Sequence, residues 1–269
     1  MLEKTLNKIV VVIPTHKEKL NEFELISFKQ ALLVFKNYDI YIVGPNNINF
    51  SEYKVVGNNF QIITFDPIFF SSLHFYNKLK INSDFYVKFE KYDYLLTYEL
   101  DSFVFKDDLE YWSNLGVDYI GAPWFKGFED TSNSDFFTVG NSGFSMRKIS
   151  TCIKVINRFN YFIFPYSSSS NLFTKFFYYI LYKLQSFFLL FGFNFSKKVK
   201  FSINEDLFFS VFVPRQFENF YIPDSNLAMK FSFEFNPRLL FEKNNFKLPT
   251  GCHAWAKYDI EFWRQFINI

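Results

Sequence analysis

A chain of 269 residues is long enough to bury a full hydrophobic core, and its formal net charge of +2 is too small to form a nucleic-acid footprint. We therefore expect one domain over residues 1–269 and no nucleic-acid partner. Aromatic residues make up 23% of the chain, so we assign a lone aromatic side chain to the core by default. The two cysteines, Cys152 and Cys252, lack metal-ligand or redox spacing, which favours a reducing cytoplasm.

The first hundred residues alternate between β-rich runs and stretches of helical period, as βαβ units do. The expected strands are 8–14 (KIVVVIP), 38–44, 60–65 and 92–98, and the expected helices are 22–35 and 71–89, the second broken near 82–83. Continuous apolar runs such as KIVVVIP are typical of parallel strands covered on both faces. The pattern predicts an α/β fold with a Rossmann-like, mostly parallel sheet flanked by helices, in which ligands bind at the carboxyl ends of the strands.

The second half is less regular. We expect a strand at 119–122, a β-rich run at 136–146, and helices at 147–159 and 205–212. Between them, the segment 161–200 forms a helical insertion with a long apolar stretch that Lys175 and Lys183 interrupt. A lysine inside a spanning helix costs about 2.5–3.5 kcal/mol. Two alternatives stay open: an interfacial helix that makes peripheral membrane contact through 172–200, with Lys197, Lys198 and Lys200 after it, and a buried hairpin or interface helix.

Two carboxylates follow the strand expected at 92–98. Glu99 and Asp101 are two residues apart, so on an extended segment they point to the same side. Without a neighbouring base they repel each other unless a cation lies between them, and Mn²⁺ or Mg²⁺ bridging to a diphosphate meets that need. A solvated strand end is the alternative reading. The apolar sequence on both sides favours a site.

The sequence also resembles bacterial glycosyltransferase-like proteins of the GT-A class. The resemblance rests on five blocks in order: the DxD-like ELD at 99–101, DYIGAPWF at 118–125, VGNSGFSMR at 139–147, NEDLFF at 204–209 and GCHAW at 251–255. It implies that Asp101 binds the metal ion, Mn²⁺ or Mg²⁺, and that His253 completes its shell. Glu99 stands where relatives carry Gln, so the resemblance leaves two roles for it, metal ligand or hydrogen-bond partner of the ribose or a metal-bound water. A hydrogen-bonded loop histidine is the alternative for His253.

The acidic pair Glu205 and Asp206 resembles the catalytic base of inverting GT-A enzymes. A carboxylate suits this task because it can take the proton of an attacking hydroxyl. Asp206 is the first choice for the base and Glu205 the second. The alternative is helix capping, with Asn204 as the N-cap and both acids in the first turn.

The donor is expected across the ends of the first strands. The resemblance implies contacts to the base and ribose from Pro14, Thr15 and His16, to the diphosphate from Lys78, and to the donor sugar or acceptor from Asn141 and Ser142. Trp124 is open to two readings, stacking on a sugar ring or packing in the core.

These expectations together describe a metal-dependent glycosyltransferase that moves a sugar from a UDP- or GDP-sugar to a glycan or lipid-linked acceptor in surface polysaccharide or lipopolysaccharide synthesis. Residues 1–110 would form the nucleotide-binding half and residues 111–269 the acceptor and catalytic half. The expected location is the cytoplasm, with peripheral attachment to the inner face of the membrane as an open alternative. A non-catalytic sugar-nucleotide-binding protein and a metal-dependent phosphoester hydrolase are the alternatives.

Overall fold

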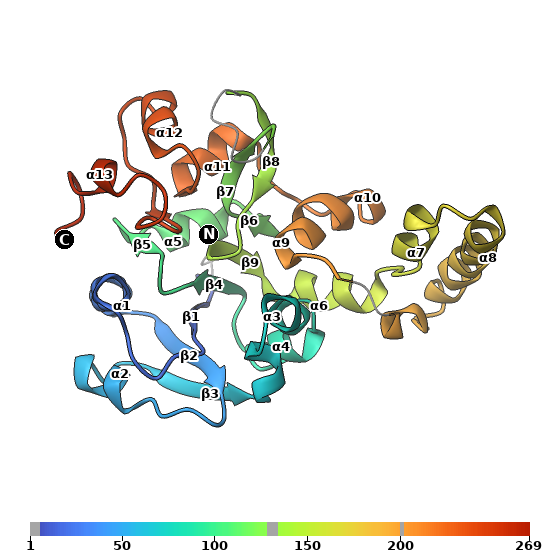
Figure 1. Ribbon diagram of the computed structural model, residues 1–269, viewed down its shortest axis with the longest axis horizontal. Helices are drawn as coiled ribbons and strands as arrows, with labels where there is room; N and C mark the ends of the chain where they lie inside the picture. The colour runs from blue at the N-terminus through green and yellow to red at the C-terminus, as the bar shows by residue number, and fades with distance from the viewer. Residues whose placement is uncertain (1–5, 128–133, 200–201) are drawn as a thin grey trace, which may run out of the picture.

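The computed structural model describes residues 6–127, 134–199 and 202–269 (Figure 1). Within these ranges, six strands form the main sheet, in the order β3-β2-β1-β4-β9-β6. The first four are parallel, whereas β9 runs antiparallel to both of its neighbours. The expected α/β fold with a mostly parallel sheet flanked by helices is therefore confirmed.

The elements of the first half lie close to their expected bounds. They are β1 (Ile9–Pro14), α1 (Glu22–Val34), β2 (Asp39–Pro45), α2 (Ser51–Val56), β3 (Gln61–Phe65), α3 (Leu73–Lys80), α4 (Ser83–Val87) and β4 (Tyr94–Tyr98). The break expected near 82–83 separates α3 from α4, because the Asn82 side chain caps the new helix by accepting from the Asp84 amide. The short helix α2 was not expected.

The second half contains more short elements than its sequence suggests. They are β5 (Phe103–Val104), α5 (Leu109–Asn114), β6 (Tyr119–Ile120), β7 (Ala122–Phe125), β8 (Phe136–Gly140), β9 (Phe144–Lys148), α6 (Ile149–Arg158), α7 (Ile163–Ser168), α8 (Leu172–Leu189), α9 (Glu205–Leu207), α10 (Val213–Gln216), α11 (Ser225–Phe231), β10 (Ser232–Phe233), α12 (Pro237–Lys243), β11 (Gly251–Cys252) and α13 (Ile260–Trp263). The run at 136–146 is two strands in different sheets, and the helix expected at 205–212 is α9 followed by one π-helical turn (Phe208–Phe212).

Alternate residues of β1 bury themselves in two different cores, as a strand covered on both faces must. Ile9, Val11 and Ile13 pack with α1, α5 and α11 on one face. Val10 and Val12 pack on the other face with α3, α4, α6 and the π-helical turn. The sheet is thus a middle layer between two helical layers.

The strand order also fixes where a ligand can bind. The chain runs from β1 outward to β2 and β3 and then returns to β4 on the other side of β1. Loops leaving β1 and β4 therefore diverge, and a crevice opens between their carboxyl ends.

A smaller sheet joins distant parts of the chain. Its order is β10-β11-β5, with β11 parallel to β10 and antiparallel to β5. Because β5 comes directly after β4, this sheet brings residues near 234 and 253 to the end of the main sheet.

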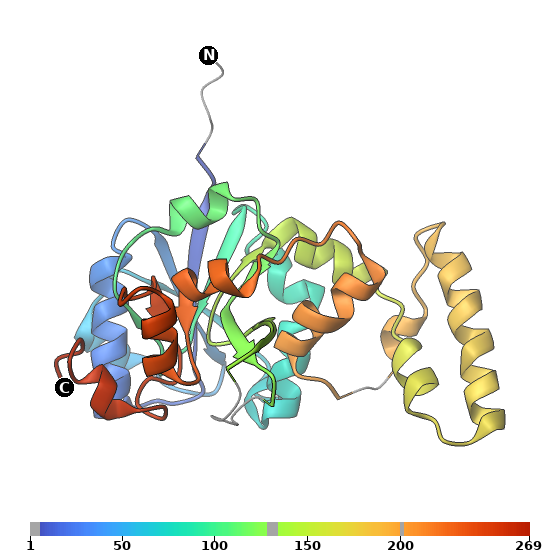
Figure 2. The same cartoon turned by 90° about the horizontal axis from the view of Figure 1, so that it is seen from above.

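The insertion at 161–200 is helical, as expected. Helices α7 and α8 form a hairpin that projects from the rest of the molecule (Figure 2). Lys200, which belongs to the basic end of this segment, lies outside the described residues. Among the helices of the described ranges, none is both long and apolar enough to cross a bilayer.

Candidate active site

A cavity of about 600 Å³ lies at the crevice between β1 and β4. Its lining comes from the segments that leave these two strands and from the start of α3: Pro14, Thr15, His16, Lys17, Glu24, Phe70, Ser71, Ser72, Leu73, Tyr76, Glu99, Leu100 and Asp101. The cavity is large enough for a cofactor-sized ligand. It lies where open α/β sheets bind theirs.

Three potential metal ligands meet beside this cavity. One ligand atom each from Glu99, Asp101 and His253 lies within 4.8 Å of the other two. His253 Nε2 is 3.2 Å from Asp101 Oδ1 and 3.6 Å from Glu99 Oε2. Asp101 is 51% exposed, so the group is open to solvent on one side. Two carboxylates and an imidazole are a donor set that suits Mn²⁺, and the open side leaves room for further oxygen ligands.

The small sheet explains how His253 reaches Asp101 across 152 positions of sequence (253 − 101). Pairing of β11 with β5 places Cys252 opposite Phe103, two residues beyond Asp101. The neighbouring strand β10 ends just before Glu234, whose Oε1 lies 2.8 Å from His253 Nδ1. A proton on Nδ1 that is donated to Glu234 leaves the Nε2 lone pair for a cation, the arrangement found around metal-bound histidines.

Charge around His253 favours a bound cation. Burial opposes its protonation, but Asp101, Glu234 and Glu99 outweigh burial and raise its pKa well above the usual range. Three carboxylates thus share one imidazole. A divalent cation would replace that proton and satisfy the same carboxylates.

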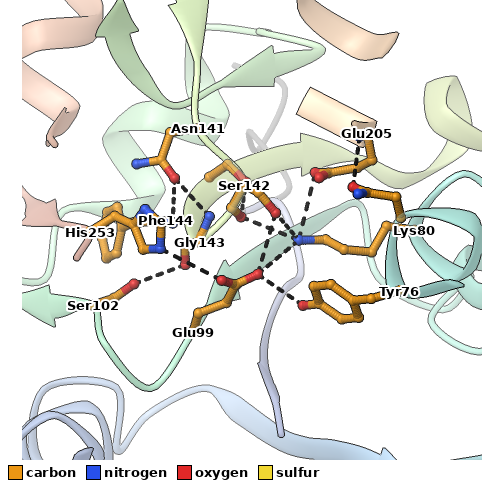
Figure 3. Close-up of polar contacts among 12 residues, drawn as sticks. Tyr76, Lys80, Glu99, Ser102, Asn141, Ser142, Gly143, Phe144, Glu205 and His253 are labelled. Carbon is orange, nitrogen blue, oxygen red and sulfur yellow. Dashed lines mark hydrogen bonds and ion pairs between the residues drawn. The ribbon is translucent and has the colours of Figure 1, made fainter. Parts of the chain in front are cut away.

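Three side chains, two from α3 and one from the turn between β8 and β9, hold Glu99 (Figure 3). Its Oε1 accepts from Tyr76 Oη at 2.9 Å, from Lys80 Nζ at 3.2 Å and from Ser142 Oγ at 3.3 Å. Burial opposes ionisation of Glu99, but Lys80 and His253 together lower its pKa well below the usual range. Glu99 therefore stays ionised, and its Oε2 faces the histidine.

The turn between β8 and β9 packs tightly against the histidine. Asn141 has a left-handed φ of 76°, and its Oδ1 accepts from the Gly143 amide at 2.7 Å. A Cβ on Gly143 would lie 2.1 Å from Cδ2 and 2.3 Å from Nε2 of His253. Only glycine lets the backbone approach the ring this closely.

Behind this turn lies a buried ion network. Glu205 is 1% exposed and forms ion pairs with Arg147 and, at 3.6 Å, with Lys80. Asn77 Oδ1 accepts from the Glu205 amide at 2.9 Å and thereby fixes the start of α9 to α3. Two cations thus hold the Glu205 carboxylate on the protein side of α9.

Asp206, the next residue, has a different environment. Burial, together with the charge of Glu205, raises its pKa to about 7. Such a carboxylate is half ionised near neutral pH, as a general base at that pH should be. Asn204 occupies the N-cap position of α9 and both acids lie in its first turn, as the capping alternative has it, but the Asn204 side chain makes no capping hydrogen bond.

The residues expected from sequence fall into two groups. Pro14, Thr15, His16, Glu99 and Asp101 line the cavity, and Ser142 and His253 contact Glu99 at its edge. Asn141 does not line the cavity, because it is 1% exposed and binds the Gly143 amide. Lys78 does not reach the cavity. It lies over the Phe75 ring and lines a separate cavity with His74 and Lys197. Tyr76, two residues earlier on α3, lines the first cavity, and residues two apart on a helix face different sides.

Trp124 belongs to the core. It is 4% exposed, and a Cβ on Gly140 would meet its ring at 2.2 Å. Its Nε1 donates to Glu234 Oε2 at 3.3 Å, so Trp124 supports the carboxylate that orients His253.

Sequence reasoning missed three residues of the site: Tyr76, Lys80 and Glu234. The first two lie on α3 beside the residue expected to contact phosphate, and a lysine on a helix gives no sign in sequence that it is buried. Glu234 stands as a lone acid within the apolar run SFEF, which is a weak signal of a paired buried carboxylate.

Comparisons with known proteins give a family and distant structural likenesses. Residues 59–253 match a family described as "Protein of unknown function (DUF5672)". No curated protein matches the sequence.

Three solved structures illustrate the likenesses. The first is a glycosyltransferase involved in the glycosylation of the major capsid of PBCV-1 (11% identity, 97% of this chain, 100% of that chain, TM-score 0.48). The second is an active-site mutant of LgtC (14% identity, 91% and 86%, TM-score 0.46), and the third is mouse xyloside xylosyltransferase 1 (9% identity, 92% and 97%, TM-score 0.45). At TM-scores below 0.5, none of these likenesses indicates what this chain does.

Proposed function

The chain belongs to the family described as "Protein of unknown function (DUF5672)", a description that assigns no activity, and we propose from the geometry of its site that it is a metal-dependent glycosyltransferase of the GT-A type. The donor would be a nucleotide sugar, UDP- or GDP-linked. The acceptor would be a glycan or a lipid-linked sugar of surface polysaccharide or lipopolysaccharide synthesis.

One observation carries the proposal. Glu99, Asp101 and His253 form a compact donor set at the edge of a cofactor-sized cavity, at the point where the strand order reverses. A nucleotide lying across the ends of β1 and β4 would direct its diphosphate toward this set. The bound Mn²⁺ or Mg²⁺ would supply charge neutralisation for the leaving diphosphate.

The remaining roles belong to side chains. His16 and Lys17 line the β1 side of the cavity, where base and ribose would lie. Asp206 would take the proton of the acceptor hydroxyl, because its raised pKa of about 7 suits a base. Glu205, which was the second choice for the base, is proposed instead to hold Lys80 and Arg147 in place.

A mononuclear site favours transfer over phosphoester hydrolysis by a pair of metal ions. Within the described ranges, Glu99, Asp101 and His253 are the one group of three such side chains close enough to hold a metal. Dinuclear phosphatases need a second set of ligands about 4 Å away.

The test is a thermal-shift screen of UDP- and GDP-sugars with and without Mn²⁺, followed by a transfer assay with the sugar that binds. A ligand present at 100 times its Kd stabilises the fold by about 2.7 kcal/mol. We expect stabilisation that requires both the nucleotide sugar and the metal, and then release of the nucleoside diphosphate in the presence of acceptor. Stabilisation without turnover would refute the proposed transfer and favour the alternative, a non-catalytic sugar-nucleotide-binding protein. No metal-dependent stabilisation by any sugar nucleotide would refute the site.

A further inference from the structure

Helix α8 carries a continuous apolar stripe on the side away from the body of the molecule. The stripe consists of Phe173, Phe176, Phe177, Ile180, Leu184, Phe187 and Phe188 of α8 and Phe191 just after it. These side chains are between 41% and 81% exposed. At 3.6 residues per turn they fall within roughly 120° of the helix circumference, and no charged residue lies among them.

The opposite side of α8 is the one that carries polar contacts to the protein. Gln185 is fully buried, and its Oε1 accepts from the amides of Phe195 and Ser196 at 3.0 and 2.9 Å. Asn160 donates to Tyr182 O at 2.8 Å and to Ser186 Oγ at 2.9 Å. A surface helix in water shows the reverse arrangement, with its apolar side inward. The polarity of α8 therefore suits surroundings less polar than water.

Ring contacts join the two helices of the hairpin. Tyr166 of α7 packs against Tyr179 and Tyr182 of α8 at centroid distances of 5.7 and 6.1 Å. Phe162 packs against Tyr178 at 6.4 Å on the same inner side. These contacts cover the inner side of α8 and leave the stripe exposed.

The charge of this part of the chain has one sign. No Asp or Glu occurs anywhere in 136–204, while the segment 161–200 contains five lysines. Lys183 borders the stripe on α8, whereas Lys175 lies on the inner side of the hairpin, over the Tyr166 ring. After the stripe, Lys197 is bound to Ser83 and Asn157 of the body, and Lys198 is exposed. Each lysine near an anionic bilayer contributes about 1 kcal/mol of attraction, which corresponds to about fivefold in affinity.

We propose that the α7–α8 hairpin docks on the surface of an anionic lipid bilayer, with the stripe in the acyl boundary and Lys183 among the headgroups. Apolar side chains on one side and lysines at the rim are the combination that interfacial helices use. A second copy of the chain would also cover the stripe, but it would bring two sets of lysines together with no acid from either segment. Charge therefore favours the bilayer over self-association.

The test is co-sedimentation of the full chain with vesicles, without any nucleotide sugar, so that its outcome is independent of the proposed activity. One set of vesicles is phosphatidylcholine alone, and the other contains phosphatidylcholine and phosphatidylglycerol in equal parts. We expect binding to the anionic vesicles at least tenfold tighter than to the neutral ones. The Phe173→Ser, Phe176→Ser double variant should bind at least tenfold more weakly, since each exchange removes a large apolar side chain from the acyl boundary.

Two further variants separate the parts of the proposal. Lys183→Gln should weaken anionic binding by about fivefold, the contribution of the one lysine beside the stripe on α8. Phe246→Ser is the matched control, because Phe246 is 70% exposed but lies outside the hairpin, and its binding should equal that of the wild type. Equal binding by the stripe variant and the wild type would overturn the proposal. A concentration-dependent dimer would also overturn it, if the stripe variant abolished the dimer and vesicles did not compete with dimerisation.

Discussion

Replacing Asp206 by Asn should change both the pH dependence of stability and the reaction. The pKa of Asp206 rises from 3.8 to about 7 in the folded chain, because the carboxylate is buried and Glu205 lies beside it. The folded state therefore binds this proton more tightly than the unfolded chain does. The stability that the protonated form contributes is full below pH 3.8 and is lost as the pH rises to about 7.

The size of the effect follows from that difference. At 1.36 kcal/mol for each pH unit it corresponds to roughly 4 kcal/mol, and since Asp206 retains some contact with solvent we expect about half of it. The free energy of unfolding of Asp206→Asn, relative to wild type, should thus grow by roughly 2 kcal/mol between pH 4 and pH 8. At pH 8 this means a rise in Tm of about 4–8 °C.

Urea denaturation at pH 4, 6 and 8 measures the change directly. Asp84→Asn is the matched control, because Asp84 also occupies the second position of a helix but is exposed. Because the Asp84 side chain is exposed, its replacement should change the free energy of unfolding by less than about 0.5 kcal/mol. In the transfer assay, wild-type kcat should fall as the pH drops below about 7, and Asp206→Asn should lose turnover while it still binds the donor. Parallel stability curves for Asp206→Asn and wild type, or full turnover by the variant, would refute the reasoning.

Three further substitutions test the rest of the site. Asp101→Asn should lose Mn²⁺-dependent binding of the nucleotide sugar with an unchanged circular dichroism spectrum, and unchanged binding would mean that the metal lies elsewhere. Gly143→Ala places a Cβ 2.1 Å from the His253 ring, so isothermal titration should find the affinity for Mn²⁺ lowered by roughly 10- to 100-fold. Gly57→Ala is the control, because its Cβ meets only the end of the Leu32 side chain, and this variant should keep the wild-type affinity. Lys80→Met leaves Glu205 and Glu99 without a shared cation and should lower the free energy of unfolding by about 3 kcal/mol. The control Lys78→Met should change it by no more than about 0.5 kcal/mol. Equal losses in the two variants would show that the buried ion pairs of Lys80 do not stabilise the fold.

The fold of the first half could be predicted because its signals are local. The run IVVVIP is apolar at every position, and β1 is buried on both faces for that reason. The capping box of Asn21 and Glu24 likewise marks the start of α1 within its own sequence. The short strands β5, β10 and β11 have no such signal, since two residues carry no period.

Residues of the site could be predicted only where the sequence around them is distinctive. Asp101 and His253 interrupt apolar surroundings within recognisable blocks, and the structure brings them to 3.2 Å. Lys78 and Lys80 look equivalent in FYNKLK, yet only Lys80 turns inward to Glu99. Which side of α3 faces the cavity depends on how α3 packs against the sheet, and this packing is decided by tertiary contacts outside the segment.

The small sheet β10-β11-β5 determines when the site can exist during synthesis. A nascent chain that ends near residue 230 already contains every strand of the main sheet, together with Glu99, Asp101 and Asp206. It lacks β11, and so it has neither His253 nor the pairing that positions this residue beside Asp101. A ribosome-bound intermediate would present carboxylates without their imidazole and would hold the metal weakly. The proposed activity is therefore withheld until β11 and His253 have left the exit tunnel and paired with β5.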